Sequence, residues 1–397
     1  MMEPSISTYI WPGQVHFGFG AVDRVAEEAK AYCGTNVFLI TDPGVAATGL
    51  VESVTAPLKA ADLPFEIYDQ VVPNPDTDLV DEAVEAFRAS GANLIIGLGG
   101  GSGLDTAKAV RLVAGGPAEG CIVEYSPFLE DARRPTPLSK NMPPLIAIPT
   151  TAGTGSEVTP WALIVDNEGQ CKFGAGGTPA AVPNVALVDP GLTLGLPPFI
   201  TAATGVDALS HCIEAYVSTN DNPILDPMIL YGIELIGRSL RTAVAYGDHR
   251  EARHDIMQAA LIGGVAITSK WLGACHSLAH PLSSLAGVQH GVANAIMLPH
   301  QMEFSLIGAV DRYARIGQAL ERSFPVIGTI RQRAEKAVEA VHQLVADTGL
   351  PSRLKDAGIT RDMIPDLADG AYHDPNWTSN PRSVTRDDLE QLYLKAY

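Results

Sequence analysis

Short apolar runs alternate with helical patterns over the first half of the chain, and few folds accommodate such an alternation. Five runs rich in β-branched and other apolar residues read NVFLITD, PFEIYDQVV, NLIIGLGGG, PLIAIPTT and NVALVD. Helical stretches such as VDEAVEAFRAS lie between them. Buried strands that alternate with helices indicate a parallel sheet covered by helices on both faces. We therefore predict an α/β domain over residues 1–188.

The second half of the chain lacks such strand-like runs. After Asp189-Pro190 the sequence reads as successive amphipathic helices: FITAATGVDALSHCIEAYV, PMILYGIELIGRSL, HDIMQAALIGGVAI, VDRYARIGQALERS and TIRQRAEKAVEAVHQLVADTG. We predict an all-helical domain over residues 189–397. Two domains also suit the length, because 397 residues exceed what a typical single core organises.

The composition excludes several classes of partner. Hydrophobic residues make up 46% and charged residues 18%, as in a compact globular protein. The net charge is −18, from 45 acidic against 27 basic residues, and no run rich in lysine or arginine occurs. Binding to nucleic acid or to an anionic membrane surface is therefore not expected.

Cysteine usage and the chain start indicate the compartment. The five cysteines are widely spaced and form no C-x-x-C pair, which fits a reducing cytoplasm better than a disulfide framework. The first twenty residues lack the basic and apolar regions of a signal peptide. The longest apolar runs are too short to span a bilayer. We expect a cytoplasmic protein without membrane contact.

One aspartate and four histidines gather between residues 205 and 291. Asp207 and His211 are four residues apart, which on a helix places carboxylate and imidazole on one face, and His276 and His280 repeat this spacing. His290 follows a Leu/Ser/Gly segment that can end one helix and return a further imidazole. Three imidazoles and one carboxylate suit Fe(II), Zn(II) or Mn(II), with an open position for substrate. The alternative is a set of hydrogen-bonded core histidines.

A glycine-rich turn in the first half suits a nucleotide diphosphate. Gly99, Gly100 and Gly101 follow the strand-like NLII and precede a helical pattern, where backbone N–H groups can bind phosphate. The motif is neither G-x-G-x-x-G nor a Walker A sequence, and a tight strand-to-helix connection is the alternative. Asp42, after VFLIT, is placed to bind an adenosine ribose and repel a 2′-phosphate, or to cap a helix. IPTTAGTGSEVT adds a loop rich in hydroxyl donors.

Five ordered motifs together resemble the iron-containing, group III alcohol dehydrogenase family. They are GGGSGLDTAK, PTTAGTGSEVT, GVDALSHCIEAY, HSLAHPL and QHGVANAIMLP, and NPR at residues 380–382 is similar to the C-terminal signature of that family. The resemblance implies a dehydroquinate synthase-like fold, with an N-terminal dinucleotide-binding α/β domain and a helical C-terminal domain. It also implies a cofactor and a metal in the cleft between the domains, and a homodimer or larger homo-oligomer.

The resemblance also assigns residues. The family's metal ligands fall on Asp207, His211, His276 and His290, with Fe(II) as the first choice and Zn(II) or Mn(II) as alternatives. His280 matches a non-ligand histidine near the nicotinamide, and we expect it to carry the proton, alone or together with the cofactor ribose. Contacts to the dinucleotide are expected at Asn74, Gly100, Gly101, Ser102, Thr150, Thr154 and Lys172. An acid at Asp42 favours NAD, with NADP not excluded.

These features predict an NAD(P)-dependent alcohol dehydrogenase or aldehyde reductase. Hydride would pass between the cofactor and a small primary alcohol or aldehyde whose oxygen binds the metal. Trp161, Lys270 and Trp271 depart from the family pattern and suggest a pocket for a short aldehyde with an anionic tail; the opposing interpretation places Lys270 toward solvent and Trp271 in the core. A metal-dependent hydrolase or lyase using the same cluster, and a non-catalytic binding protein, remain alternatives from other classes.

Overall fold

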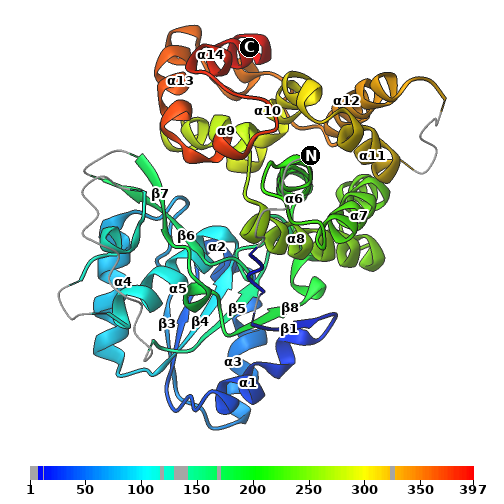
Figure 1. Cartoon of the computed structure of the whole chain (residues 1–397). Helices are drawn as coiled ribbons and strands as arrows, with labels where there is room; N and C mark the ends of the chain where they lie inside the picture. Colours follow the sequence, from blue (N-terminus) through cyan, green and yellow to red (C-terminus); the bar gives the residue numbers. More distant parts are fainter. Residues whose placement is uncertain (1–7, 12, 117–119, 129–141, 168–170, 322–326) are drawn as a thin grey trace. The chain divides into compact units, whose positions relative to one another are not determined.

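The computed structural model describes residues 8–11, 13–116, 120–128, 142–167, 171–321 and 327–397 (Figure 1). The chain divides into two compact units. An α/β unit comprises Trp11–Thr151 and Ser156–Thr193, and a helical unit comprises Met1–Ile10, Ala152–Gly155 and Leu194–Tyr397. The short segment Ala152–Gly155 thus joins the helical unit although both of its flanks belong to the α/β unit. The domain boundary between residues 188 and 189 stays a prediction.

A six-stranded parallel sheet forms the centre of the α/β unit, with strand order β1-β8-β5-β4-β2-β3. The strands are β1 Gln14–Phe17, β2 Val37–Ile40, β3 Phe65–Tyr68, β4 Leu94–Gly99, β5 Leu145–Pro149 and β8 Val185–Val188. The five predicted strands correspond to β2, β3, β4, β5 and β8. In the register of β4 with β5, Gly99 lies opposite Pro149, so both strands end at the same edge. The glycine-rich turn at Gly99, Gly100 and Gly101 and the Thr-rich loop, IPTTAGTGSEVT at residues 148–159, leave the sheet from that edge.

Helices cover both faces of this sheet, as predicted for buried parallel strands (Figure 1). One hydrophobic cluster packs α1 (Val25–Ala31) and α3 (Leu50–Ala60) on one face. A second cluster packs α4 (Thr77–Ser90) and α5 (Gly101–Ala114) on the other. Alternate residues of β2 separate accordingly, because Val37 and Leu39 belong to the first cluster and Phe38 and Ile40 to the second. The short helix α2 (Pro43–Ala47) follows β2 directly.

Two strand features escaped the sequence prediction. Strand β1 pairs along β8 at the sheet edge, from Gln14 opposite Val185 to Phe17 opposite Val188. Its four residues, QVHF, give too short an alternation to distinguish from a loop. Strands β6 (Trp161–Asp166) and β7 (Cys171–Gly176) form a separate antiparallel pair.

The helical unit contains no strand within its described residues, in agreement with the prediction. Its α-helices are α6 Pro198–Val217, α7 Asp226–Ala245, α8 Arg250–Lys270, α9 Ala274–Ser284, α10 His290–Ser305, α11 Val310–Leu320, α12 Ile330–Asp347, α13 Ile364–His373 and α14 Arg386–Ala396. Helix α6 packs against α7, α8 and α10, and α9 packs against α10 and α13. The neighbouring helices surround α6, and every residue from Thr201 to Val217 is buried.

Among the described residues no single helix is long and apolar enough to cross a membrane. The consecutive helices α8 and α9 meet that criterion of length and composition only when taken together, and they are bent by 108° relative to each other.

Substituting Gly97 tests the packing of α5 on the sheet. A Cβ atom at Gly97 would lie 2.8 Å from Ala107 Cβ and 3.2 Å from Leu104 Cδ2, so α5 would have to move. We expect Gly97→Ala to lower the free energy of unfolding by about 1–3 kcal/mol. Thermal unfolding of this variant would measure the effect. Gly195→Ala is the matched control, because nothing lies within 4 Å of a Cβ there. Equal melting temperatures for the two variants would contradict this account of the packing.

Candidate active site

Helix α6 carries two polar side chains of the predicted cluster into the protein interior. Asp207 and His211 are 2% and 4% exposed, and they lie one turn apart on this helix. Small residues let the neighbouring helices approach closely. A Cβ at Gly263 of α8 would lie 3.1 Å from His211 Cβ, and one at Gly291 of α10 would overlap the carbonyl oxygen of Ala203. The contact at Gly291 fixes the first turn of α10, where His290 begins the helix.

Three imidazoles lie around one oxygen atom of Asp207. Asp207 Oδ1 lies 3.7 Å from His211 Nε2, 3.7 Å from His276 Nε2 and 3.5 Å from His290 Nε2. Two atoms that bind one ion at 2.0–2.2 Å with tetrahedral geometry are about 3.4 Å apart, so these spacings suit a shared cation. The ligand atoms of Asp207, His276 and His290 all lie within 4.8 Å of one another. His211 falls outside that mutually close set, but its ring stacks on that of His276.

The amide nitrogen of Asn294 marks a region that three polar atoms of the cluster face. Its Nδ2 lies 2.8 Å from Asp207 Oδ1, 3.3 Å from His276 Nε2 and 3.2 Å from His290 Nε2. Its Oδ1 accepts a hydrogen bond from Cys275 Sγ at 3.5 Å, which orients the amide. One amide nitrogen thus lies within hydrogen-bond distance of all three atoms. A carboxylate and imidazole nitrogens directed to one region form a donor set that fits a divalent cation.

Outer partners hold the imidazoles in this orientation. Glu214 Oε2 lies 2.5 Å from His276 Nδ1, while its Oε1 accepts a hydrogen bond from Cys275 N at 2.7 Å. Nδ1 of His211 lies 3.2 Å from the carbonyl oxygen of Gly153. An imidazole whose Nδ1–H is donated to an outer acceptor presents the lone pair of Nε2, which is the usual arrangement around a bound metal.

Electrostatic coupling in the buried cluster alters three pKa values. Burial alone would raise the pKa of Asp207, but His211, His290 and His276 hold this pKa well below its ordinary value. Burial lowers the pKa of His211 to about 4, against the opposing effect of Asp207. Burial also acts to lower the pKa of His276, but hydrogen bonds to Asp207 and Glu214 raise it to about 9. Since coordination requires a free lone pair, a cation must compete with a proton at His276.

The fifth residue of the predicted cluster, His280, lies beside the ligand atoms and outside the mutually close set. It is one turn after His276 on α9, and the ring centroids of the two are 6.0 Å apart. Its ring stacks on that of His290 at 5.4 Å. Its Nδ1 lies 2.6 Å from Asp374 Oδ2.

Three polar residues around the cluster were missed by the sequence analysis. Glu214 follows Asp207 by seven residues on one helix and Asn294 follows His290 by four, and both spacings place side chains on a shared helix face. Those spacings could have identified them. Asp374 lies 94 residues after His280, and no local pattern connects the two.

The glycine-rich turn has the backbone arrangement expected for phosphate. Strand β4 ends at Gly99, and α5 begins at Gly101 with Gly100 as a cap residue that supplies no side-chain hydrogen bond. The first N–H groups of this 14-residue helix therefore have no side-chain cap. Ser102 lies in the same first turn. Thr150 follows β5, and its N–H donates to the Gly99 carbonyl oxygen at 2.9 Å.

Asp42 is a helix cap, as the alternative interpretation had it. Its Oδ1 accepts a hydrogen bond from Val45 N at 2.9 Å at the start of α2. Its Oδ2 would lie 3.5 Å from a Cβ at Gly99, so the carboxylate sits beside the glycine-rich turn. The role of Asp42 toward a ribose stays a prediction.

The remaining predicted cofactor contacts belong to different units. Asn74 has φ 53°, a left-handed conformation that asparagine adopts readily, and it accepts a hydrogen bond from Lys172 Nζ at 3.1 Å within the α/β unit. Thr154 belongs to the helical unit. The next residue, Gly155, has φ 62°, and a Cβ there would overlap the backbone of Gly264 in α8. Only glycine at position 155 allows the loop backbone to lie this close to α8.

A buried ion pair fixes the last part of the Thr-rich loop to α5. Lys108 is 1% exposed, and its Nζ lies 3.0 Å from Asp105 Oδ1 and 3.2 Å from Thr159 Oγ1. Asp105 also accepts hydrogen bonds from Ser156 Oγ at 2.6 Å and from Leu163 N at 3.2 Å. The i, i+3 spacing of Asp105 and Lys108 is the sequence feature that could have indicated this pair.

The structure does not support the hypothesis of a cationic substrate pocket at Lys270. This side chain is fully buried, and its Nζ lies 3.1 Å from Asp226 Oδ1 as an ion pair without the alignment of a hydrogen bond. Asp226 also binds Arg312 at 2.9 Å. Burial lowers the pKa of Lys270, although Asp226 opposes this effect. Lys270 therefore neither faces solvent nor offers an uncompensated charge to a substrate.

The two tryptophans of that hypothesis are both partly buried. Trp271 follows the last residue of α8 with φ 68°. Trp161 begins β6, and its ring lies 5.3 Å from that of Phe128. Their roles toward a substrate stay predictions.

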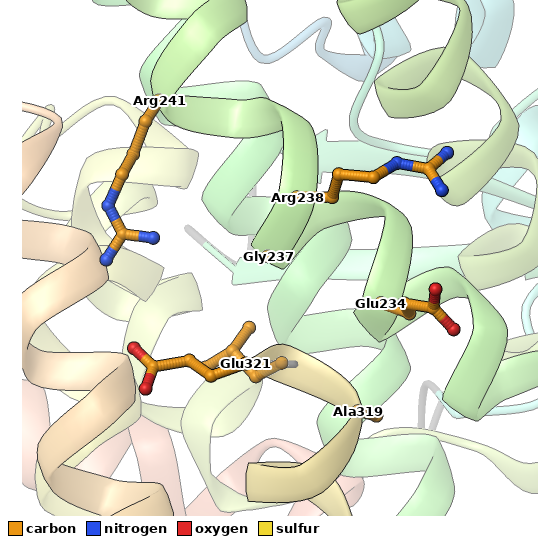
Figure 2. Close-up of a pocket in the computed structure, with 7 residues that line it drawn as sticks. Glu234, Gly237, Arg238, Arg241, Ala319 and Glu321 are labelled. Carbon is orange, nitrogen blue, oxygen red and sulfur yellow. The ribbon is translucent and has the colours of Figure 1, made fainter. Parts of the chain in front are cut away.

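A separate cavity of about 380 Å³ lies between α7 and the end of α11 (Figure 2). Arg238, Arg241, Glu234 and Glu321 line it, and no predicted site residue does. Both arginines already form ion pairs, Arg238 with Asp255 at 2.7 Å and Arg241 with Asp347 at 2.6 Å. This charged cavity is thus distinct from the histidine cluster.

Comparison with known families decides the identity of the chain. Residues 12–190 match the family model for iron-containing alcohol dehydrogenase, and residues 201–397 match the C-terminal model of the Fe-containing alcohol dehydrogenase family. The chain belongs to the iron-containing alcohol dehydrogenase family. The predicted family, fold and enzyme class, an alcohol dehydrogenase or aldehyde reductase, are confirmed.

Known members of the iron-containing alcohol dehydrogenase family match over nearly the whole chain. Lactaldehyde reductase of Escherichia coli (strain K12) is 37% identical over 382 residues, which are 96% of this chain and 97% of that protein. A crystal structure of 1,3-propanediol oxidoreductase has a TM-score of 0.93 and 34% identity, and the match covers 99% of this chain and 100% of that one. Sulfoacetaldehyde reductase from Bifidobacterium kashiwanohense, solved in complex with NAD⁺, has a TM-score of 0.86 and 28% identity, with 99% of both chains covered.

Glu157 of the Thr-rich loop gives a pH-dependent prediction. It is 3% exposed, and burial raises its pKa to about 7 against the opposing effects of its own backbone N–H and Lys108. A carboxyl group whose pKa is raised by folding stabilises the fold fully below its unfolded pKa near 4.5, and this contribution is lost as pH rises through 7. The loss is on the order of 3 kcal/mol.

Replacing Glu157 with glutamine should remove this dependence. We expect the melting temperature of Glu157→Gln relative to the unsubstituted protein to be higher at pH 8 than at pH 5. The control is Glu335→Gln, because Glu335 is exposed and pairs with Arg331 on the surface of α12. Parallel pH profiles for the unsubstituted protein and Glu157→Gln would refute the assignment.

Proposed function

We propose that this chain transfers hydride between NAD(H) and the carbonyl carbon of a small aldehyde, or the reverse from a primary alcohol, with the help of one bound divalent cation. Family membership supports the reaction class. The observation that carries the proposal is the convergence of Asp207, His276 and His290 on one region of the helical unit, with His211 beside them. A purely structural set of histidines would not need to direct its lone pairs together.

The metal would be held by Asp207, His211, His276 and His290, with Fe(II) as the first choice and Zn(II) or Mn(II) as alternatives. A divalent cation in this site supplies Lewis acidity, which polarises a carbonyl or lowers the pKa of an alcohol toward neutrality. Glu214 and Gly153 keep two of the imidazoles oriented for such a cation. The single carboxylate leaves the site with a net positive charge that favours a developing alkoxide.

The cofactor would lie on the carboxyl edge of the parallel sheet. The uncapped first turn of α5 at Gly100, Gly101 and Ser102 suits the diphosphate. Asn74, Thr150, Thr154 and Lys172 are proposed to bind the rest of the dinucleotide. Asp42 favours NAD, because its carboxylate would repel the 2′-phosphate of NADP.

His280 would carry the proton that accompanies hydride transfer. Its ring lies beside the rings of two proposed ligands, His276 and His290, but His280 is not itself a proposed ligand. An imidazole is suited to this role because its nitrogens can both accept and donate a proton.

The substrate would be a short, uncharged primary alcohol or aldehyde. A substrate with an anionic tail would lack the counter-charge proposed for it, since Lys270 is buried against Asp226. The net charge of −18 also disfavours nucleic acid as a partner. A cytoplasmic homodimer or larger homo-oligomer remains the expected working form.

Cofactor oxidation tests this function directly. Protein reconstituted with Fe(II) or Zn(II) would be mixed with NADH or NADPH and a panel of small aldehydes, and absorbance at 340 nm followed. We expect faster oxidation of NADH than of NADPH, lost on adding a chelator.

Substitution at the cluster should have the same effect as the chelator. His276→Ala should lower kcat/KM by at least about 10²-fold, because the cation loses a ligand and Glu214 loses its partner. His342→Ala is the control, since His342 is exposed on α12 and outside the cluster. Turnover that survives both the chelator and His276→Ala would contradict the proposal.

A further inference from the structure

The two ring nitrogens of His280 have different surroundings. Nδ1 lies 2.6 Å from Asp374 Oδ2, a short distance typical of a hydrogen bond to a carboxylate. Nε2 is buried and has no hydrogen-bond partner among the residues that the structure describes. Since a carboxylate can only accept, Nδ1 must carry a hydrogen. The neutral ring therefore presents a lone pair at Nε2.

Asp374 is itself held in place by its second oxygen. Oδ1 accepts hydrogen bonds from Ser277 Oγ at 2.8 Å, from Asn376 N at 2.9 Å and from Asn376 Nδ2 at 2.8 Å. Ser277 Oγ in turn accepts a hydrogen bond from Trp377 N at 2.9 Å, so its own hydrogen is directed to Asp374. The side chain of Asp374 is 9% exposed. Burial would raise the pKa of Asp374, but His280 and these donors lower it, so the group is a carboxylate.

The carboxylate and its donors come from two distant parts of the chain. Ser277 precedes His280 by one turn of α9, and Asp374 caps the short 3-10 helix Pro375–Ser379. The backbone of that 3-10 helix and Ser277 together fix which oxygen faces His280. Such an arrangement resembles a base and its orienting group more than a chance surface ion pair.

We propose that Asp374 is a positioning residue that fixes the orientation and tautomer of His280, so that Nε2 exchanges the substrate proton. This inference rests on the proposed function, in which His280 carries that proton. In alcohol oxidation a bound NAD⁺ would supply the acceptor for the hydride of the C–H bond that breaks. The hydroxyl proton passes to His280 Nε2, the imidazolium is stabilised by Asp374, and the proton is then released to solvent. Aldehyde reduction follows the same path in reverse.

An asparagine at residue 374 should reverse the tautomer of His280. Ser277 Oγ and Asn376 N both donate to the Oδ1 position, so the amide oxygen of an asparagine would occupy that position. Its NH₂ group would then face His280 Nδ1 and force the hydrogen onto Nε2. The ring would stay in place but could no longer accept a proton at Nε2.

Steady-state kinetics of Asp374→Asn test the inference. We expect kcat to fall by about 10²-fold or more while KM for the aldehyde changes little, because substrate binding does not involve Asp374. Asp374→Glu, which keeps the carboxylate, should recover part of the loss. Rates would be expressed per NADH-binding site, so that misfolded protein does not enter the comparison.

A buried aspartate with a different task supplies the control. Asp189 is 3% exposed and accepts hydrogen bonds from Gly20 N at 2.9 Å, Val22 N at 3.3 Å and Gly191 N at 2.8 Å. Asp189→Asn should lower stability but leave kcat per NADH-binding site unchanged. Equal kcat losses in Asp374→Asn and Asp189→Asn would show that Asp374 is merely structural and would overturn the inference.

A measurement that does not depend on turnover separates the two proposals. Nitrogen-15 NMR of the histidine rings in the Zn(II)-loaded protein, with His280 assigned from His280→Gln, should show the Nδ1–H tautomer in the unsubstituted protein and the Nε2–H tautomer in Asp374→Asn. An Nε2–H tautomer in the unsubstituted protein would overturn the inference. The expected tautomers combined with full activity of His280→Gln would uphold the positioning role but refute His280 as the proton carrier.

Discussion

A buried carboxylate, Asp207, sets the requirement that the helical unit must satisfy. It lies on a helix whose residues are buried from Thr201 to Val217, and an uncompensated charge in such surroundings is strongly destabilising. Three imidazoles surround its Oδ1 within 3.7 Å, and Asn294 donates to it at 2.8 Å. Helix α9 contributes His276, and α10 contributes His290 and Asn294, to the surroundings of Asp207 on α6. The cluster and the packing around α6 therefore depend on each other.

The same physical requirement extends outward through the imidazoles. Two of the histidines whose Nε2 faces the cluster have an acceptor for the other nitrogen: Glu214 for His276 and the carbonyl oxygen of Gly153 for His211. Gly153 lies in Ala152–Gly155, the part of the Thr-rich loop that belongs to the helical unit. In the same way, His280 has Asp374 as the partner of its Nδ1. Its Nε2 is proposed to exchange a proton instead of binding the cation. One proposed metal ligand, His276, and the proposed proton carrier, His280, thus lie on the same helix, α9, with different outer partners.

Local sequence patterns predicted the features that depend on local sequence. The strands from Val37 to Val188 are short apolar runs, the long amphipathic helices have a period of 3.6 residues, and the i, i+4 pairs at Asp207 and His276 lie on helices as expected. The sequence could not place Asp374 beside His280, because only the tertiary fold joins residues so distant. It could not show that Lys270 is buried against Asp226 either, since a lysine in a helix has the same pattern whether it is paired or solvated.

Anomalous X-ray scattering from crystals of the Fe(II)-loaded protein would test the central claim most directly. Data collected on both sides of the iron absorption edge locate the ion without reference to activity. The account predicts one iron peak at about 2.0–2.3 Å from Asp207 and from Nε2 of His211, His276 and His290. A peak bound by other residues, or iron that binds stoichiometrically without contacting Asp207, would contradict it.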